Sequence, residues 1–336
     1  MKILLIRLGR IGDIVLSLGV ANAIKETFHD SDVTLLTDEK ARDLVFEHPA
    51  LDNVIYLNKS LLKKMSKIKA FFSIVKTIKE LKKNKFDIAI DLQCFLETAF
   101  IAYLTSAKKR VGYNERMRGI FYNIKVKPIA GKRHDFLMQL KLAEAIGVNI
   151  DSVINKVSNG IHPTIKISDK ARLYRDIFLK SVGINEFNRI VGINPGASVD
   201  YKRWGKHNFA ILADKLIEKY NVKVIIFWGP EEEKIAMEVK NLMVNAGVLC
   251  CKTNLGELAA FAERCNIFIT NDSGPMHIAY AVKVPTFAVF IKEHSDPDIS
   301  GPIGYKNMVF NITREAKEDE NYSIIEELVK AAGEVL

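Results

Sequence analysis

The sequence lacks the features that mark membrane-spanning, disulfide-bonded or zinc-binding proteins. No apolar run approaches the roughly 18 residues of a membrane span, and Met1 is not followed by a long apolar leader with a small-residue cleavage site. The 336 residues include only four cysteines, and none forms a C-x-x-C pair. This usage predicts buried, reduced thiols in a cytoplasmic protein without structural zinc.

Acidic residues are relatively scarce in the first half of the chain. Residues 1–160 contain 27 Lys and Arg against 17 Asp and Glu, whereas residues 161–336 contain 22 against 23. The net charge of +9 therefore comes entirely from the first half. We expect the two halves to bind different partners, with an anionic one for the first.

Short apolar runs alternate with amphipathic helical patterns along the whole chain. Such alternation predicts parallel βαβ units and hence an α/β protein. A length of 336 residues exceeds one ordinary core, so we predict two doubly wound, Rossmann-like domains facing a central cleft. We expect an N-terminal domain over residues 1–160, a second domain over 161–320, and a C-terminal helix, 321–336, that packs back on the N-terminal domain.

The first glycine-rich turn has two glycines, Gly9 and Gly12, followed by an aspartate. The stretch "RLGRIGDIVLS", residues 7–17, follows an apolar run but lacks the G-x-G-x-x-G spacing of a dinucleotide site. Ligands of open parallel sheets bind beyond the carboxyl ends of the strands, which is where this turn is expected. Asp13 is therefore either a general base or the cap of the helix that follows.

The turn "NDSGPMHIA" in the second half has the composition of an anion site. Asp272 and Ser273 offer capping oxygens, and Gly274 lets the backbone approach a ligand. The N–H groups of the following helix suit a diphosphate, and His277 lies one turn further on. Helix capping alone is the alternative interpretation.

Two further turns in the second half follow predicted strands. The stretch "NPGAS", residues 194–198, presents backbone donors, and Lys202 follows as a point charge for phosphate; the alternative is a surface turn with a solvated lysine. The stretch "WGPEEEK" begins a helix with three acids. These acids either complement the helix dipole or accept hydrogen bonds from a ribose.

In order and content these turns resemble the second half of glycosyltransferase family 9, the lipopolysaccharide heptosyltransferases. The matching pieces are "NPGAS…YKRW", "WGPEEE", "TNLGELAAFAERC" and "NDSGPMHIAYAVKVPTFAVF", and the opening "MKILLIRLGRIGDIV" resembles the first strand and turn of the family. One departure is Gly19, where many relatives have proline. We expect it to loosen the helix start slightly.

The resemblance implies GT-B architecture and metal-independent sugar transfer, with no cofactor beyond a nucleotide-sugar co-substrate. By resemblance, Lys202 neutralises the donor diphosphate, Glu231 or Glu232 holds the ribose, and the segment 253–255 flanks the base. Asp13 and Lys202 are the predicted catalytic residues. The predicted donor site comprises Asn194, Gly196, Ala197, Ser198, Lys202, Trp228, Glu231, Glu232, Thr253, Leu255, Asp272, Ser273, Gly274 and His277.

A lysine-rich stretch distinguishes the first half. Ten lysines lie between Lys59 and Lys85, and apolar residues recur at helical spacing, which predicts one amphipathic helix from about Leu61 to Lys83. Three interpretations compete: a solvated face over a stripe packed in the core, contact with an anionic membrane or glycolipid, and nucleic acid, which no accompanying motif supports. The predicted acceptor site comprises Gly12, Lys63, Lys64, Arg116 and Arg118.

Together these features predict an inverting transferase that moves a heptose or related sugar, from ADP-heptose by family resemblance, to an inner-core lipopolysaccharide acceptor. We expect it in the cytoplasm, peripheral to the inner membrane, without nucleic acid. A GT-B-like sugar-nucleotide epimerase, or a non-catalytic module that binds a nucleotide sugar or an anionic surface, are the alternatives. An epimerase would not need a basic first half, and a binding module would not need Asp13.

Overall fold

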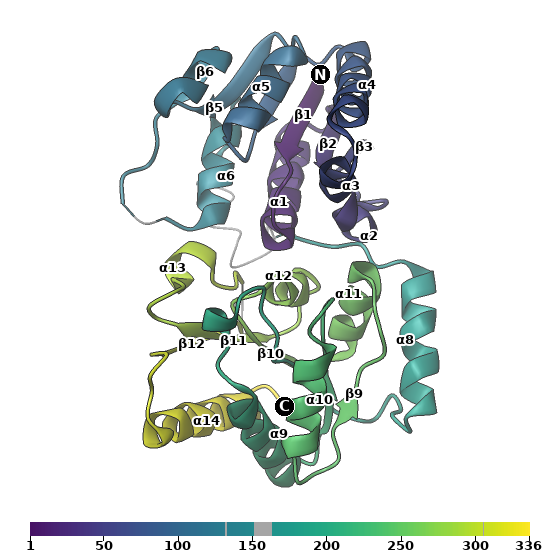
Figure 1. The fold of residues 1–336 in the computed structure, drawn as a ribbon, viewed down its shortest axis with the longest axis vertical. Coiled ribbons are helices and arrows are strands. Elements are labelled where there is room, and N and C mark those ends of the chain that lie inside the picture. Colours follow the sequence, from purple (N-terminus) through teal and green to yellow (C-terminus); the bar gives the residue numbers. More distant parts are fainter. Residues whose placement is uncertain (132, 151–162, 305) are drawn as a thin grey trace. The chain divides into compact units, whose positions relative to one another are not determined.

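The chain folds into two compact units, Met1–Lys166 and Ile167–Leu336. The computed structural model, drawn in Figure 1, describes residues 1–131, 133–150, 163–304 and 306–336. The predicted boundary at residue 160 lies outside the described residues.

The first unit is built on a six-stranded parallel sheet with strand order β3-β2-β1-β4-β5-β6. Residues 3–6 of its central strand are wholly buried, as expected of a parallel strand covered on both faces. The strand order reverses between β1 and β4, which makes their carboxyl ends a topological switch point. The strands are β1 (Lys2–Arg7), β2 (Asp32–Asp38), β3 (Asn53–Leu57), β4 (Ile88–Asp91), β5 (Lys109–Tyr113) and β6 (Ile124–Val126).

Helices cover both faces of this sheet. On one face Leu4 and Ile6 share a core with Leu81 of α4 and Ala99 of α5. Helix α1 is apolar on nearly all sides and packs against α6. The helices are α1 (Ile11–Thr27), η1 (Glu39–Ala41), α2 (Arg42–Val45), α3 (Lys59–Lys64), α4 (Lys67–Asn84), α5 (Leu96–Leu104), η2 (Arg116–Phe121) and α6 (Asp135–Glu144).

Gly19 sets the distance between α1 and α6. It lies in the middle of α1, and a Cβ at this position would come within 2.6 Å of Cε2 of the buried Phe136. The expectation that Gly19 loosens the start of the helix is therefore wrong. Its role is to allow close helix packing.

The lysine-rich stretch forms two helices rather than the single one predicted. Helix α3 ends at Lys64, and the Ser66 hydroxyl accepts a hydrogen bond from the Lys69 N–H, as the N-cap of α4. Ile68 and Phe72 are 71% and 65% exposed, so this part of the predicted stripe is not packed in a core. Among the described residues, no helix is both long enough and apolar enough to cross a membrane.

The second unit repeats the same topology. Its six parallel strands have the order β12-β11-β10-β7-β8-β9, so that, counted within the unit, the order again reverses between the first and fourth strands. Their carboxyl ends form a second switch point, between β7 and β10. The strands are β7 (Ile190–Asn194), β8 (Lys223–Ile226), β9 (Val248–Leu249), β10 (Ile267–Asn271), β11 (Thr286–Ile291) and β12 (Met308–Ile312).

The C-terminal helix is part of the second unit. Ile325, Leu328 and Val329 of α14 lie in one core with Phe209 and Leu216 of α9. Its apolar face is thus buried within its own unit, and packing of this helix on the N-terminal domain stays a prediction. The helices are α8 (Asp169–Ser181), η3 (Asp200–Lys202), α9 (Lys206–Tyr220), α10 (Glu233–Leu242), α11 (Leu255–Arg264), α12 (Gly274–Ala281), α13 (Pro297–Ser300) and α14 (Glu318–Gly333).

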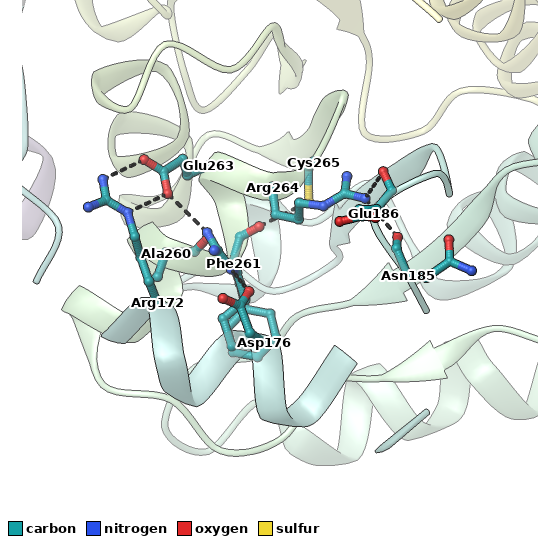
Figure 2. A network of polar contacts seen from close by, with 10 residues as sticks. Arg172, Asp176, Asn185, Glu186, Ala260, Phe261, Glu263, Arg264 and Cys265 are labelled. Atoms are coloured by element: carbon teal, nitrogen blue, oxygen red, sulfur yellow. Dashed lines mark hydrogen bonds and ion pairs between the residues drawn. The ribbon is translucent and has the colours of Figure 1, made fainter. Parts of the chain in front are cut away.

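Helix α8 is the first helix of the second unit. The Ser168 hydroxyl accepts from the Ala171 N–H and caps it. Figure 2 shows how α8 is fixed to α11: the Arg172 guanidinium donates two hydrogen bonds to Glu263, at 3.0 and 2.8 Å. Arg264 donates to the carbonyls of Asn185 and Glu186, so α11 is also tied to the segment that precedes β7.

Candidate active-site residues in the two units

Asp13 forms an ion pair at the switch point of the first unit. The turn after β1 brings Arg7 and the first turn of α1 together, with 2.6 Å between Arg7 Nη2 and Asp13 Oδ2. Arg7 Nη1 also donates to the Leu92 carbonyl, which follows β4. Arg10 is the N-cap of α1 and makes no side-chain capping bond among the described residues. The alternative role of Asp13 as the capping residue is therefore wrong.

A polar cavity of about 850 Å³ opens around this ion pair. Asp13 is 21% exposed and Arg7 12% exposed, so the cavity reaches a carboxylate that is largely screened from bulk water. Burial, and then the neighbouring charge of Asp13, raises the pKa of Asp135 above its ordinary value. The cavity is lined by Arg7, Leu8, Gly9, Arg10, Asp13, Asp38, Glu39, Lys40, Asn58, Lys59, Ser60, Gln93, Phe95 and Asp135.

Several of these lining residues are absent from the sequence-based site. Asp38 ends β2, Asn58 follows β3 and Gln93 follows β4, where the Gln93 side chain accepts from the Leu8 N–H at 2.8 Å. The carboxyl ends of parallel strands meet at one edge of a sheet. The rule that located Asp13 would therefore have located these three as well.

The residues predicted to bind the acceptor are dispersed. Gly12 is buried in the first turn of α1, and Lys64 is exposed at the end of α3. Arg118 forms an ion pair with Glu115. The side chains of Lys63 and Arg116 lie outside the part of the chain that the structure describes.

Two asparagines hold the turns of the second switch point together. Asn271, at the end of β10, donates to the Pro195 carbonyl at 2.8 Å and accepts from the Trp204 N–H at 3.0 Å. Asn194, at the end of β7, donates to the Gly196 carbonyl at 3.3 Å. The turns 195–198 and 272–274, far apart in sequence, are thus joined at one edge of the sheet.

Lys202 and Asp272 form a partly buried ion pair. Asp272 is 7% exposed and Lys202 is 20% exposed, so the carboxylate lies beneath the ammonium group. An ionised carboxylate repels a diphosphate. This geometry favours Lys202 as the phosphate-binding cation and Asp272 as the group that holds it in place.

The start of α12 presents backbone donors beside this pair. Ser273 is the N-cap but makes no side-chain capping bond in the described part of the chain; its hydroxyl lies 3.0 Å from Thr270 Oγ1 instead. The first N–H groups of α12, from Gly274 onward, are therefore not used by that side chain. His277 is buried, with Nδ1 2.8 Å from the Tyr280 hydroxyl oxygen.

The two acids predicted to hold a ribose differ in exposure, and Glu232 is the half-buried one. Its carboxylate folds over Gly196, where a Cβ would overlap it, and accepts from the Gly229 N–H at 3.0 Å. Burial raises the pKa of Glu232 above its ordinary value. Glu231 is exposed, with a left-handed backbone at φ 68°.

The remaining predicted donor residues lie on the same unit. Trp228 donates from Nε1 to the Cys250 carbonyl at 2.8 Å, and Ala197 is buried whereas Ser198 is exposed. Thr253 and Leu255 are half-buried on either side of Asn254, the N-cap of α11. Among the described residues, no group of three or more His, Cys, Asp or Glu side chains is arranged to hold a metal ion.

Comparison with known proteins identifies relatives along the whole chain. Residues 74–329 match the family model of glycosyltransferase family 9 (heptosyltransferase). Lipopolysaccharide heptosyltransferase 1 of Campylobacter coli is 25% identical over 302 residues, which covers 86% of this chain and 84% of the relative.

Solved structures show the same fold. A glycosyl transferase family 9 protein from Veillonella parvula superimposes with a TM-score of 0.84 at 24% identity, covering 99% of this chain and 96% of the other. The E. coli ADP-heptose lps heptosyltransferase II gives 0.78 at 20% identity, covering 100% and 98%.

These matches confirm the predicted α/β class with two GT-B-type Rossmann-like domains. They also confirm the predicted enzyme class, a glycosyltransferase, because the family model describes heptosyltransferases and the Campylobacter relative is one. The model covers well over half of the chain. This chain therefore belongs to glycosyltransferase family 9, the heptosyltransferases.

Proposed function

We propose that this enzyme is an inverting, metal-independent transferase that moves a heptose from ADP-heptose to an inner-core lipopolysaccharide acceptor. The observation that carries the proposal is the Asp13 carboxylate, paired with Arg7 in a polar cavity at a switch point. Similarity to the E. coli ADP-heptose heptosyltransferase II supports the donor, and similarity to the Campylobacter lipopolysaccharide heptosyltransferase 1 supports the acceptor.

In the proposed reaction the acceptor hydroxyl oxygen bonds to the anomeric carbon as the bond from that carbon to the diphosphate breaks. The electron pair of that bond leaves with ADP, and the hydroxyl proton passes to Asp13. An aspartate has an ordinary pKa of about 3.9 and is a weak base. It suffices because the hydroxyl becomes acidic as it attacks an oxocarbenium-like carbon. A single displacement inverts the anomeric configuration.

The second unit supplies the groups that bind the donor. Lys202 and the first N–H groups of α12 offset the charge that develops on the diphosphate, the role that a metal ion has in other transferases. Glu232 accepts hydrogen bonds from the ribose. The backbone from Thr253 to Leu255 flanks the base.

We also propose a cytoplasmic enzyme that binds the inner-membrane surface peripherally and uses no nucleic acid. The support is the combination of lysines on α3 and α4 with the exposed side chains of Ile68 and Phe72. Flotation with vesicles that contain anionic phospholipid measures this binding, which should weaken as salt rises. Binding of equal strength to neutral vesicles would contradict it.

Incubation with ADP-heptose, with and without a deacylated inner-core acceptor, tests the proposed reaction. A transferase requires both substrates, an epimerase converts the donor alone, and a binding module turns over neither. NMR of the product reports the anomeric configuration, and full activity in EDTA is expected. Donor conversion without acceptor, retention of configuration, or loss of activity in EDTA would each overturn the corresponding part of the proposal.

A further inference from the structure

A second, apolar cavity of about 960 Å³ lies in the first unit. Helices α3 and α4 form one side of it and α5 the other. Ligand pockets in proteins typically enclose about 300–1,000 Å³ behind mostly apolar walls with a few polar groups. The lining residues are Leu8, Leu57, Lys59, Leu62, Ala70, Ile74, Val75, Ile78, Lys79, Lys82, Glu97, Phe100, Ile101 and Leu104.

The apolar cavity adjoins the cavity of Asp13. Leu8 and Lys59 line both. Lys59 lies at the junction, where its ammonium group donates to the Leu8 carbonyl at 3.5 Å and lies 3.9 Å from Glu97 Oε2. A polar cavity with a carboxylate thus lies next to a mostly apolar cavity, with Lys59 in the wall of both.

The charges lining the cavity favour an anionic occupant. Its walls contain three lysines, Lys59, Lys79 and Lys82, against one acid, Glu97. A molecule that suits both cavities has a sugar at one end, anionic groups near the middle and a hydrocarbon chain at the other end. An apolar peptide or a second copy of this basic chain does not match these charges.

We propose that this cavity binds an acyl chain of the glycolipid acceptor while the sugar end of the same molecule reaches Asp13. The inference rests on the proposed function for the identity of the acceptor, but not for the presence of the apolar site. The binding free energy grows in proportion to the length of the buried chain, so each methylene removed from water tightens binding about fourfold.

The binding test uses monomeric alkyl phosphates and the full-length protein, and needs no transfer activity. In calorimetric titrations, dodecyl phosphate should bind about 15-fold more tightly than decyl phosphate, from two extra methylenes. Ala70→Trp fills the cavity from the wall of α4 and should abolish this chain-length dependence. Leu96→Trp, at an exposed position of α5 that does not line the cavity, is the matched control and should retain it. Equal binding of both phosphates to the wild type would overturn the proposal.

The kinetic test compares an acylated acceptor with its deacylated form. Ala70→Trp should raise KM for the acylated acceptor about tenfold or more, and leave kcat and the KM for the deacylated acceptor unchanged. Ile74→Trp, another cavity-lining change, should do the same and guards against a folding defect in one variant. If the Leu96→Trp control raises KM equally, the effect is not specific to the cavity and the proposal fails. If Ala70→Trp instead abolishes vesicle flotation, the chain is held by the bilayer and the proposal also fails. Tight alkyl phosphate binding without any transfer would refute only the proposed function.

Discussion

The Lys202–Asp272 pair predicts that a stability defect and a donor-binding defect can be separated. Lys202→Met leaves Asp272, 7% exposed, without its counter-charge. Removal of one partner from a buried pair costs about 3–5 kcal/mol, and we expect about 3 kcal/mol because solvent reaches Lys202. Asp272→Asn should cost about 1 kcal/mol, since the amide oxygen still accepts a hydrogen bond from the ammonium group.

The double variant Lys202→Met/Asp272→Asn gives the decisive comparison. It contains no unpaired buried charge, so its urea unfolding should recover most of the loss seen in Lys202→Met. ADP binding should not recover, because a charge-assisted hydrogen bond of about 1.5–3 kcal/mol, or roughly 10–150-fold in Kd, is still missing. Calorimetry measures the binding. Wild-type ADP affinity in the double variant would refute the assignment of Lys202 to the diphosphate.

Three further predictions concern pH, packing and the ribose. Burial lowers the pKa of His48 from 6.5 to about 4. Protonation of this imidazole therefore favours the unfolded state, and the free energy of unfolding should fall by about 3 kcal/mol between pH 6.5 and pH 4. In urea unfolding, His48→Gln should remove this pH dependence, whereas a change at the exposed His29 should leave it. Identical pH profiles for His48→Gln and the wild type would contradict the role of His48. Gly19→Ala should lower stability by about 1–3 kcal/mol through overlap with Phe136, despite a helix-propensity gain of about 1 kcal/mol; a raised Tm would disprove the close packing. Glu232→Gln should reduce the preference for ADP over 2′-deoxy-ADP by up to about tenfold, and an unchanged ratio of Kd values would exclude the ribose contact.

The sequence predicts the sheets well because a parallel strand buried on both faces is a short, continuous apolar run. The apolar run "NVIYL" coincides with β3, and the helical pattern of residues 206–220 coincides with α9. Strands β6, β9 and β12 do not stand out as such runs. β6 and β9 contain too few residues to form a pattern.

Features that depend on tertiary packing partners could not be predicted from the sequence. The periodicity that predicted one amphipathic helix is also compatible with a break at Ser66 and an exposed Ile68. Helix α8 is held by arginines paired with Glu263 of α11, a contact that leaves no pattern in the sequence. Periodicity indicates that one face of α14 is buried, but not that this face packs against α9.

The site shows the same division between local and long-range information. The turn that contains Asp13 was identified from local spacing, as was the turn of Ser273 and Gly274. The partners of Asp13 were not identified. The ion pair of Arg7 Nη2 with Asp13, at 2.6 Å, depends on the geometry of the turn, and the position of Asp135 depends on how α6 packs. Long-range contacts of this kind leave no spacing pattern in a single sequence.

The most direct test of Asp13 as the base is the turnover of Asp13→Asn with ADP-heptose and a deacylated acceptor. The asparagine can still accept a hydrogen bond from Arg7, so donor affinity and folding should stay close to those of the wild type. Because a positioned general base contributes about 10²–10⁴-fold, kcat should fall by about 100-fold or more. A kcat within a few-fold of the wild-type value would contradict the account.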